Sequence, residues 1–257
     1  TRRDFADFCV AAERLDGCIG IVLDALDAAG LADNTLVICT TDHGIAFPFM
    51  KCNLLDHGIG VMLILRGPGG FRGGGVVDAM VSHLDVFPTV AEVAGLPAPA
   101  WLQGRSLTPL ARDPGAAWRE ELFAEVNYHA AVEPMRAVRT TRHKYIRRYD
   151  GRLAPVLPNC DDSPSKNELL RAGWAGRPLA AEMLFDLAFD PNEACNLAQD
   201  PAYGGVLEDM RARLNRWMQD TRDPLLAGGL VPWPQMTVNP PDDPSPQGRM
   251  VPAEPSP

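Results

Sequence analysis

The sequence has no long apolar run. Its most apolar stretch, residues 61–65, is followed directly by Arg66, whereas a membrane-spanning helix needs about 18 consecutive apolar residues. The chain also does not open with the basic leader and apolar segment of a signal peptide. We therefore expect a soluble protein without a membrane partner. Its compartment stays open, cytoplasmic or periplasmic if the source is bacterial.

Long basic runs and closely paired cysteines are also missing. No run of lysine and arginine is longer than a pair, and the formal net charge is −9, which argues against a nucleic-acid partner held through phosphate contacts. The six cysteines are scattered, without the spacing of a zinc site or the density of a disulfide scaffold. An anionic ligand would therefore need a local basic pocket.

The composition itself is that of a globular protein. Apolar residues make up 46% of the 257 residues and charged residues 22%, enough for one large domain, alone or with a smaller companion. In the first half, apolar residues recur at helical spacing or form short β-rich runs, typical of strands buried on both faces of a parallel sheet. The elements expected there are helices at residues 5–26 and 85–94 and strands at residues 35–40, 61–65 and 76–82.

From residue 118 the pattern changes to short strands joined by turns, followed by one helix, which is typical of an antiparallel α+β subdomain. The expected elements are strands at residues 122–127, 135–140, 144–149 and 183–187 and a helix at about 203–219. Residues 221–257 hold ten of the 24 prolines and predict an irregular tail. The expected regions are thus an α/β domain at 1–115, the subdomain at 116–220 and the tail at 221–257.

Asp42 and His43 follow the strand expected at residues 35–40. Ligands collect beyond the carboxyl ends of strands in an open parallel sheet, and a carboxylate beside an imidazole can turn toward one divalent cation. Gly44 would let the backbone turn sharply there. The alternative is an ordinary loop in which Asp42 caps a turn and His43 is solvated.

Further basic and aromatic residues suggest an anion pocket. Lys51 follows an apolar loop that can hold its ammonium group over the same strand edge, although most lysines are solvated surface groups. His129 ends one expected strand and Arg136 lies on the next. Guanidinium groups suit sulfate, phosphate and carboxylate oxygens. The alternative is that these charges form the wet face of an antiparallel sheet.

Taken together, several motifs resemble, in order and spacing, the second half of a sulfatase, with most similarity to the N-sulfoglucosamine sulfohydrolase branch. They extend from residue 4 to about residue 220. The stretches that carry the resemblance, besides Lys51, are residues 15–20, 33–38, 41–48, 67–69, 81–89, 95–96, 104–107, 133–138, 184–187, 190–193 and 196–198.

The resemblance implies the fold of the alkaline phosphatase superfamily: an α/β domain with a large mixed sheet and flanking helices, plus a small antiparallel α+β subdomain. It also implies a divalent metal, calcium first and manganese as the alternative, with Asp42 and His43 as ligands. Lys51 would hold the sulfate, and His129 with Arg136 would form the wall for a small anionic substrate, a sulfated sugar or an aryl sulfate.

The nucleophile of sulfatases is a formylglycine made from the Cys or Ser of a Cys/Ser-x-Pro-x-Arg motif, and none of the six cysteines here lies in such a motif. We therefore expect this chain to be the C-terminal portion of a longer enzyme, inactive without its N-terminal half as a partner. The competing hypotheses are a phosphonate or phosphate monoester hydrolase of the same superfamily, which also uses an Asp-His pair, and a non-catalytic binding fragment.

Overall fold

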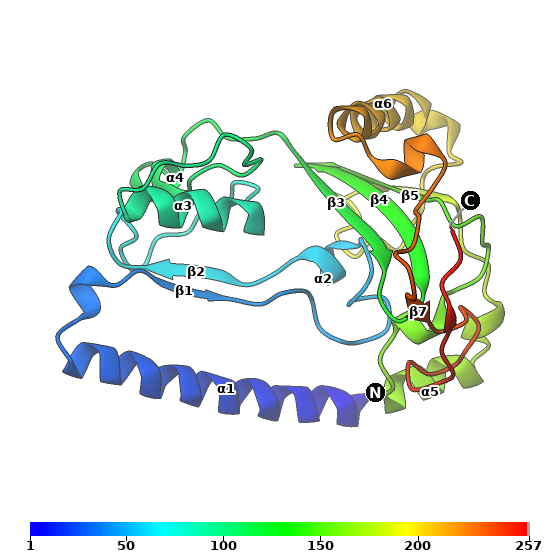
Figure 1. The fold of residues 1–257 in the computed structure, drawn as a ribbon, viewed down its shortest axis with the longest axis horizontal. Helices are drawn as coiled ribbons and strands as arrows, with labels where there is room; N and C mark the ends of the chain where they lie inside the picture. Colours follow the sequence, from blue (N-terminus) through cyan, green and yellow to red (C-terminus); the bar gives the residue numbers. More distant parts are fainter. Residues whose placement is uncertain (256–257) are drawn as a thin grey trace. The chain divides into compact units, whose positions relative to one another are not determined.

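The computed structural model describes residues 1–255 and packs them as two separate units (Figure 1). One unit, here the N unit, contains Arg2–Asp42 and Val61–Leu122. The other, here the C unit, contains Thr1, His43–Gly60 and the described part of Phe123–Pro257. The continuous regions expected from the sequence therefore differ from these units, because residues 43–60 leave the first half of the chain and pack with the second.

The N unit is built from helices around a two-stranded sheet. Its strands β1 (Val37–Thr40) and β2 (Leu63–Arg66) are antiparallel, with Val37 opposite Arg66 and Thr40 opposite Leu63. Leu107, Leu110 and Phe71 form the buried centre of its apolar cluster. The helices are α1 (Arg2–Ala28), α3 (Val86–Val93) and α4 (Thr108–Arg112), with short 3-10 helices at Ala32–Asn34 and His83–Asp85.

Two expectations for this unit were wrong. The runs at 35–40 and 61–65 do contain strands, but the strands pair antiparallel, and neither is buried on both faces, since Ile64 is 57% exposed. A short apolar run without alternation does not determine strand direction. The stretch at 76–82 forms no strand: three glycines at positions 73–75 precede it, and Val76 is 77% exposed. The two expected helices are present as α1 and α3.

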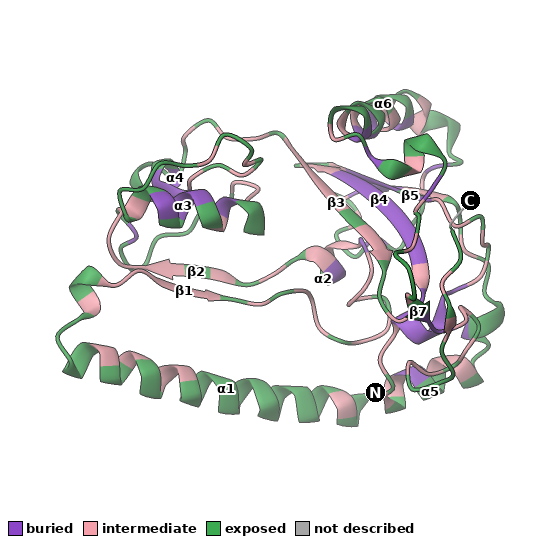
Figure 2. Ribbon diagram, in the orientation of Figure 1, coloured by how far each residue is buried: buried purple, intermediate pink, exposed green. Residues whose placement is uncertain are grey.

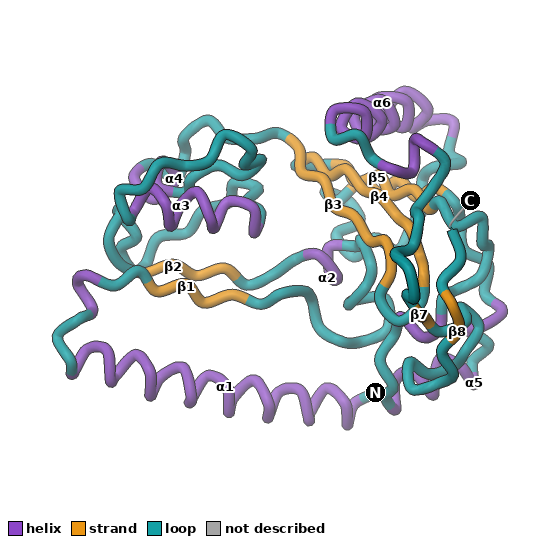
Figure 3. The backbone as a smooth tube through the Cα atoms, in the orientation of Figure 1, coloured by secondary structure: helices purple, strands orange, loops and turns teal. Residues whose placement is uncertain are grey.

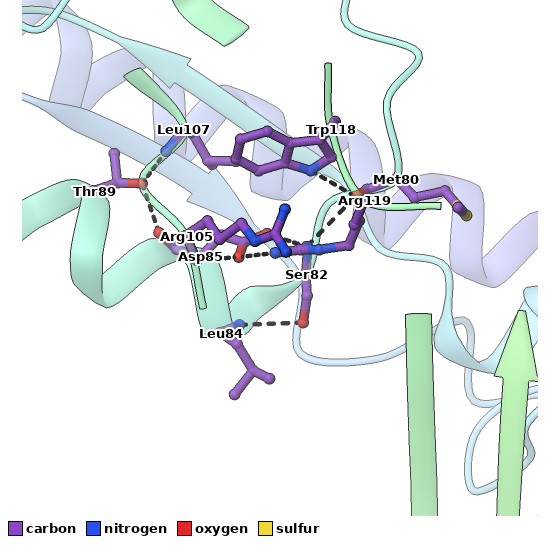
Figure 4. A network of polar contacts seen from close by, with 9 residues as sticks. All are labelled: Met80, Ser82, Leu84, Asp85, Thr89, Arg105, Leu107, Trp118 and Arg119. Atoms are coloured by element: carbon purple, nitrogen blue, oxygen red, sulfur yellow. Dashed lines mark hydrogen bonds and ion pairs between the residues drawn. The ribbon is translucent and has the colours of Figure 1, made fainter. Parts of the chain in front are cut away.

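A buried carboxylate organises the start of α3 (Figure 4). Asp85 is fully buried, and both of its oxygens accept hydrogen bonds from the Arg119 guanidinium at 2.5 Å. The same oxygens accept from the backbone N–H groups of Ser82 and Arg105, each at 2.8 Å. Nearby, the Trp118 indole donates to the carbonyl of Met80 at 2.9 Å. The carboxylate thus joins three segments that are distant in sequence.

The C unit is centred on an antiparallel sheet in the order β3-β4-β5-β6, and all four strands match the sequence-based expectation (Figure 3). Residues 141–142 connect β4 to β5 as a two-residue hairpin connection, and Met135 lies opposite Arg148. The strands are β3 (Glu121–Tyr128), β4 (Val132–Thr140), β5 (His143–Arg148) and β6 (Glu182–Asp186).

Alternation along these strands buries both faces of the sheet (Figure 2). On one face Val138, Tyr145 and Leu184 pack with the buried side of helix α6 (Gly204–Asp220). On the other face their sequence neighbours Ala137 and Ile146 pack with Leu54, Met135 and Phe185. The loop at residues 43–60, which contains helix α2 (Asp56–Ile59), is therefore seated on the sheet through Leu54.

The proline-rich tail packs against the same unit. Strand β7 (Thr237–Val238) pairs with β8 (Val251–Pro252), and the backbone N–H of Asn239 donates to the carbonyl of Ala130 at 2.8 Å. Helix α5 (Pro164–Arg171) lies between the sheet strands β5 and β6 in sequence. Across the described residues, no helix combines the length and apolarity needed to cross a membrane.

Candidate functional site

The segment that carries His43 and Lys51 folds into a tight loop that requires glycine at two places. Gly44 donates its backbone N–H to the carbonyl of Gly58 at 2.9 Å. A Cβ atom on Gly44 would lie 1.8 Å from the carbonyl oxygen of His57, and one on Gly58 would lie 2.3 Å from the carbonyl oxygens of Met50 and Asn53. A side chain at either position would therefore collide with backbone, which cannot move aside cheaply.

The middle of this loop is held on the C unit on either side of Lys51. Leu54 is 1% exposed within the core under the sheet, and Phe49 packs edge-to-face against Trp174 with ring centroids 5.5 Å apart. Phe49 and Cys52 adopt positive φ angles of 66° and 59°, an uncommon conformation for residues with a side chain. Such strain concentrates at functional sites, where surrounding packing maintains it.

Lys51 points to an acidic partner that the sequence did not single out. Its Nζ donates to Oδ2 of Asp161 at 2.8 Å, and its side chain is 19% exposed. Asp161 follows the 3-10 helix Leu157–Asn159 and stands first in an Asp-Asp pair without motif character. Only the folded structure shows that Asp161 is the partner of Lys51, because 110 residues separate the two in the sequence.

His129 lies in the electrostatic field of the same group. It follows β3 in the turn to β4 and is exposed. Partial burial lowers its pKa, and the positive charges of Lys51 and His43 lower it further, while Asp161 opposes this. We call His43, Lys51, His129 and Asp161 the anion cluster. It brings together three of the residues expected from the sequence.

The thiols beside this cluster are not suited to nucleophilic attack. Burial raises the pKa of both Cys52 and Cys160 to about 11. Only a thiolate is a good nucleophile, and at neutral pH both groups are therefore protonated.

The two expected metal ligands are adjacent in the chain, and Asp42 is the last residue of its N-unit segment while His43 is the first of the following C-unit segment. Asp42 is exposed and follows β1 closely in the chain. The Nδ1 atom of His43 lies 2.7 Å from the carbonyl oxygen of Gly44. A carbonyl only accepts, so Nδ1 is the donor in this contact, and metal-binding histidines commonly donate one ring N–H in this way. The donor types thus fit a divalent cation, although no group of three or more His, Cys, Asp and Glu side chains within residues 1–255 forms a metal site.

Arg136 does not line the anion cluster, and the expectation that it contacts substrate does not fit its position. Its side chain is fully buried. Its Nε and Nη2 donate to Asp223 at 2.5 and 3.1 Å, and its Nη1 donates to the carbonyls of Met135 and Val126 at 2.9 and 3.2 Å. Its Nε also forms an ion pair with Oε2 of Glu125 at 3.3 Å, and together these contacts tie β4 to β3 and to the segment after α6.

Two further basic residues of the sheet, Arg139 and Lys144, are also paired with carboxylates. Arg139 binds Asp56 with three contacts of 3.0–3.1 Å, and the buried Lys144 bridges Asp56 and Glu193. Burial would raise the pKa of Asp56, but the hydrogen bonds and charges of Arg139 and Lys144 outweigh it and lower the pKa. Carboxylates therefore neutralise the charges of Arg139 and Lys144. These two residues neither form a solvent-exposed face of the sheet nor offer a free charge to an anionic ligand.

Comparisons with known proteins show which proteins this chain is similar to. Residues 43–166 match the family model described as N-sulphoglucosamine sulphohydrolase, C-terminal. The human N-sulphoglucosamine sulphohydrolase is 31% identical over 247 residues, which cover 87% of this chain and 49% of the human protein. The chain is similar to the C-terminal portion of sulfatases of the alkaline phosphatase superfamily.

Solved structures show the same fold. A protein in complex with its substrate D-glucosamine-2-N,6-O-disulfate superposes with a TM-score of 0.64 at 22% identity, covering 82% of this chain and 40% of that one. The phosphonate monoester hydrolase of Agrobacterium radiobacter superposes with a TM-score of 0.59 at 25% identity, covering 85% and 42%. The chain therefore spans about half the length, or less, of the proteins it matches.

Proposed function

We propose that this chain supplies part of the active site of a sulfatase, an enzyme that hydrolyses a sulfate ester or an N-sulfo group. The observation that carries the proposal is the anion cluster: Lys51, His129 and Asp161 interact electrostatically, and with His43 all lie within the matched residues 43–166. The names of the human relative and of its family model support N-sulfoglucosamine as the substrate group.

In this proposal Lys51 binds the sulfate and offsets the negative charge that builds on the leaving oxygen or nitrogen. Asp161 holds the lysine ammonium in place, and His129 contacts the anionic sugar or aryl group. Asp42 and His43 contribute ligands to a divalent metal, calcium first and manganese as the alternative. Such a metal supplies Lewis-acid stabilisation of an anion.

The nucleophile does not come from these 257 residues in this proposal, since no cysteine stands in the Cys/Ser-x-Pro-x-Arg motif of the family and the thiols beside the cluster are protonated. An N-terminal half of the enzyme would provide it. Asp42→Ala should then abolish turnover with little loss of stability, because an exposed loop carboxylate fills no core volume.

A second candidate is a phosphonate or phosphate monoester hydrolase. The Asp-His pair at positions 42 and 43 and the likeness to the Agrobacterium enzyme favour it. Turnover of N-sulfoglucosamine, an aryl sulfate and an aryl phosphonate monoester, measured side by side with the nucleophile-bearing half present, separates the two. Preference for either sulfated compound supports the sulfatase, whereas preference for the phosphonate overturns it in favour of the second candidate.

Binding of inorganic sulfate to the chain alone gives a readout that does not depend on turnover. We expect sulfate to shift the NMR signals of His129 and of the Lys51 loop. Lys51→Ala should remove the effect, and Lys166→Ala is unsuitable as a control because Lys166 is buried. The exposed Arg171 of α5 provides the matched control, since Arg171→Ala removes a positive charge elsewhere in the C unit. Equal loss in both variants would contradict a specific site.

A further inference from the structure

The turn that carries His129 is held from two sides by buried asparagines. It closes on itself through the His129 N–H, which donates to the carbonyl of Ala131 at 3.1 Å. The N–H of Ala131 donates to Oδ1 of Asn159 at 2.8 Å, and the carbonyl of Ala130 accepts from the N–H of Asn239 at 2.8 Å. Ala131 is fully buried, so the backbone of the turn is held in place while the His129 side chain is exposed.

Asn159 uses both ends of its amide group. While Oδ1 accepts from the turn, Nδ2 donates to Oε2 of Glu133 at 2.9 Å. The other oxygen of Glu133 pairs with Arg148 at 3.1 Å. Asn159 is 4% exposed. Its amide orientation is thus fixed, because the backbone N–H needs an acceptor and the carboxylate needs a donor.

The same asparagine lies two residues before Asp161. The intervening Cys160 is held as well, because its carbonyl accepts from the buried Lys166 at 2.5 Å. One short segment, residues 159–161, therefore binds the His129 turn at its start and Lys51 at its end. Among the contacts described above, this segment gives the most direct connection between His129 and Lys51.

We propose that Asn159 is a positioning residue that sets the spacing between His129 and the Lys51–Asp161 pair. The inference rests on the proposed function, in which Lys51 binds the sulfate and His129 contacts the same anionic substrate. Asparagine fits this position because its amide oxygen accepts from the Ala131 N–H and its amide nitrogen donates to Glu133. Aspartate has the same size but lacks the amide donor that Glu133 accepts from. Above pH 7, where Glu133 is ionised, it also places a second carboxylate against Glu133, and the segment must then move, so the measurements are made at pH 8.

The test compares Asn159→Asp with Asn167→Asp, which makes the same change at an exposed position of α5. Asn159→Asp should shift the His129 ring signals in the absence of sulfate and weaken sulfate binding about tenfold or more, because small displacements of binding groups are costly. Asn167→Asp should do neither. In the double variant Asn159→Asp with Glu133→Gln, the amide at position 133 can donate to the carboxylate at position 159. This variant should recover at least half of the lost sulfate affinity, measured as the logarithm of the dissociation constant.

The outcomes separate this inference from the proposed function. If the native chain does not bind sulfate, the proposed function fails, while the His129 signals still report on positioning. If folded Asn159→Asp leaves both the His129 signals and sulfate affinity unchanged, Asn159 is not a positioning residue. Should Asn159→Asp not fold, Asn159→Ser provides the same two measurements, since its shorter side chain reaches neither partner. Absence of rescue by Glu133→Gln would also overturn the inference.

Discussion

At the scale of single residues, Lys51 combines the features of a transition-state contact. It is mostly buried, its ammonium is held by one carboxylate, and it lies between two strained residues of a rigid loop. A charge fixed in this way costs no reorganisation during reaction, which is why preorganised groups contribute strongly to catalysis. His129 is more exposed and is better placed to contact the part of the substrate that does not react.

Lys51→Ala should therefore lower kcat by about 100-fold in the complete enzyme, with a smaller change in KM. Its charge is needed most when negative charge develops in the transition state. His129→Ala should instead act mainly on KM and on the preference among sulfated substrates. Steady-state kinetics of both variants checks the assignment, and Lys51→Arg, which keeps a positive charge, should retain part of the activity. A reversed pattern would exchange the two roles.

Glu133 gives the protein a pH dependence. Burial raises the pKa of Glu133 from its ordinary value of 4.5 to about 7, against the opposing effects of Arg148 and Asn159. Between pH 4.5 and 7 the folded state therefore holds a proton that the unfolded state has released. Stability falls as pH rises through this window, by at most about 3 kcal/mol from this group, and is constant above it.

Glu133→Gln should remove that fall. Free energies of unfolding from urea titrations at pH 5 and pH 8 should show a smaller decrease for the variant than for the native chain. Glu208→Gln, at an exposed position of α6, should keep the native decrease. A native profile that is flat or rises over the same range would show that Glu133 is ionised throughout.

At the scale of elements, the loop at residues 43–60 depends on the close approach of two backbone segments. Gly44→Ala would place a methyl group 1.8 Å from a carbonyl oxygen, so the loop must open. We expect a loss of about 2 kcal/mol or more in the free energy of unfolding and weaker sulfate binding. Gly17→Ala in α1, where the added methyl meets no atom within 4 Å, should be neutral or stabilising, because alanine favours helix over glycine. Equal effects of the two changes would contradict this account.

Elements with a strong local pattern could be predicted from the sequence, and contacts between distant elements could not. The four strands of the C unit and helices α1, α3 and α6 follow from apolar spacing. The direction of β1 against β2 depends on the connection between them, which periodicity does not encode.

The candidate site could be predicted only in part. Lys51 and His129 stand out by residue type, whereas Asp161 and Asn159 acquire their roles only through contacts across 110 and 28 residues. Arg136 was predicted to contact the substrate because the sequence cannot show that Asp223 neutralises its charge.

At the scale of the whole molecule, each unit has an apolar core of its own. The Asp85 carboxylate and its partners all belong to the N unit. Asp85→Asn should therefore destabilise that unit by about 3 kcal/mol or more, because it leaves the largely buried Arg119 charge without its partner. Hydrogen exchange should accelerate in α3. Asp27→Asn, which breaks an exposed pair with Arg66, should change stability by less than about 1 kcal/mol, and similar effects of both would contradict the ranking.

The tail also has a consequence for genetics. Residues 236–255 contain no member of the anion cluster, but Asn239 supports the turn next to His129, and β7 with β8 holds Asn239. A nonsense codon after α6 would leave every proposed site residue encoded and still remove one of the two supports of that turn. Alleles truncated in the tail should therefore behave as loss-of-function alleles, and a screen that scores only changes at site residues would overlook them.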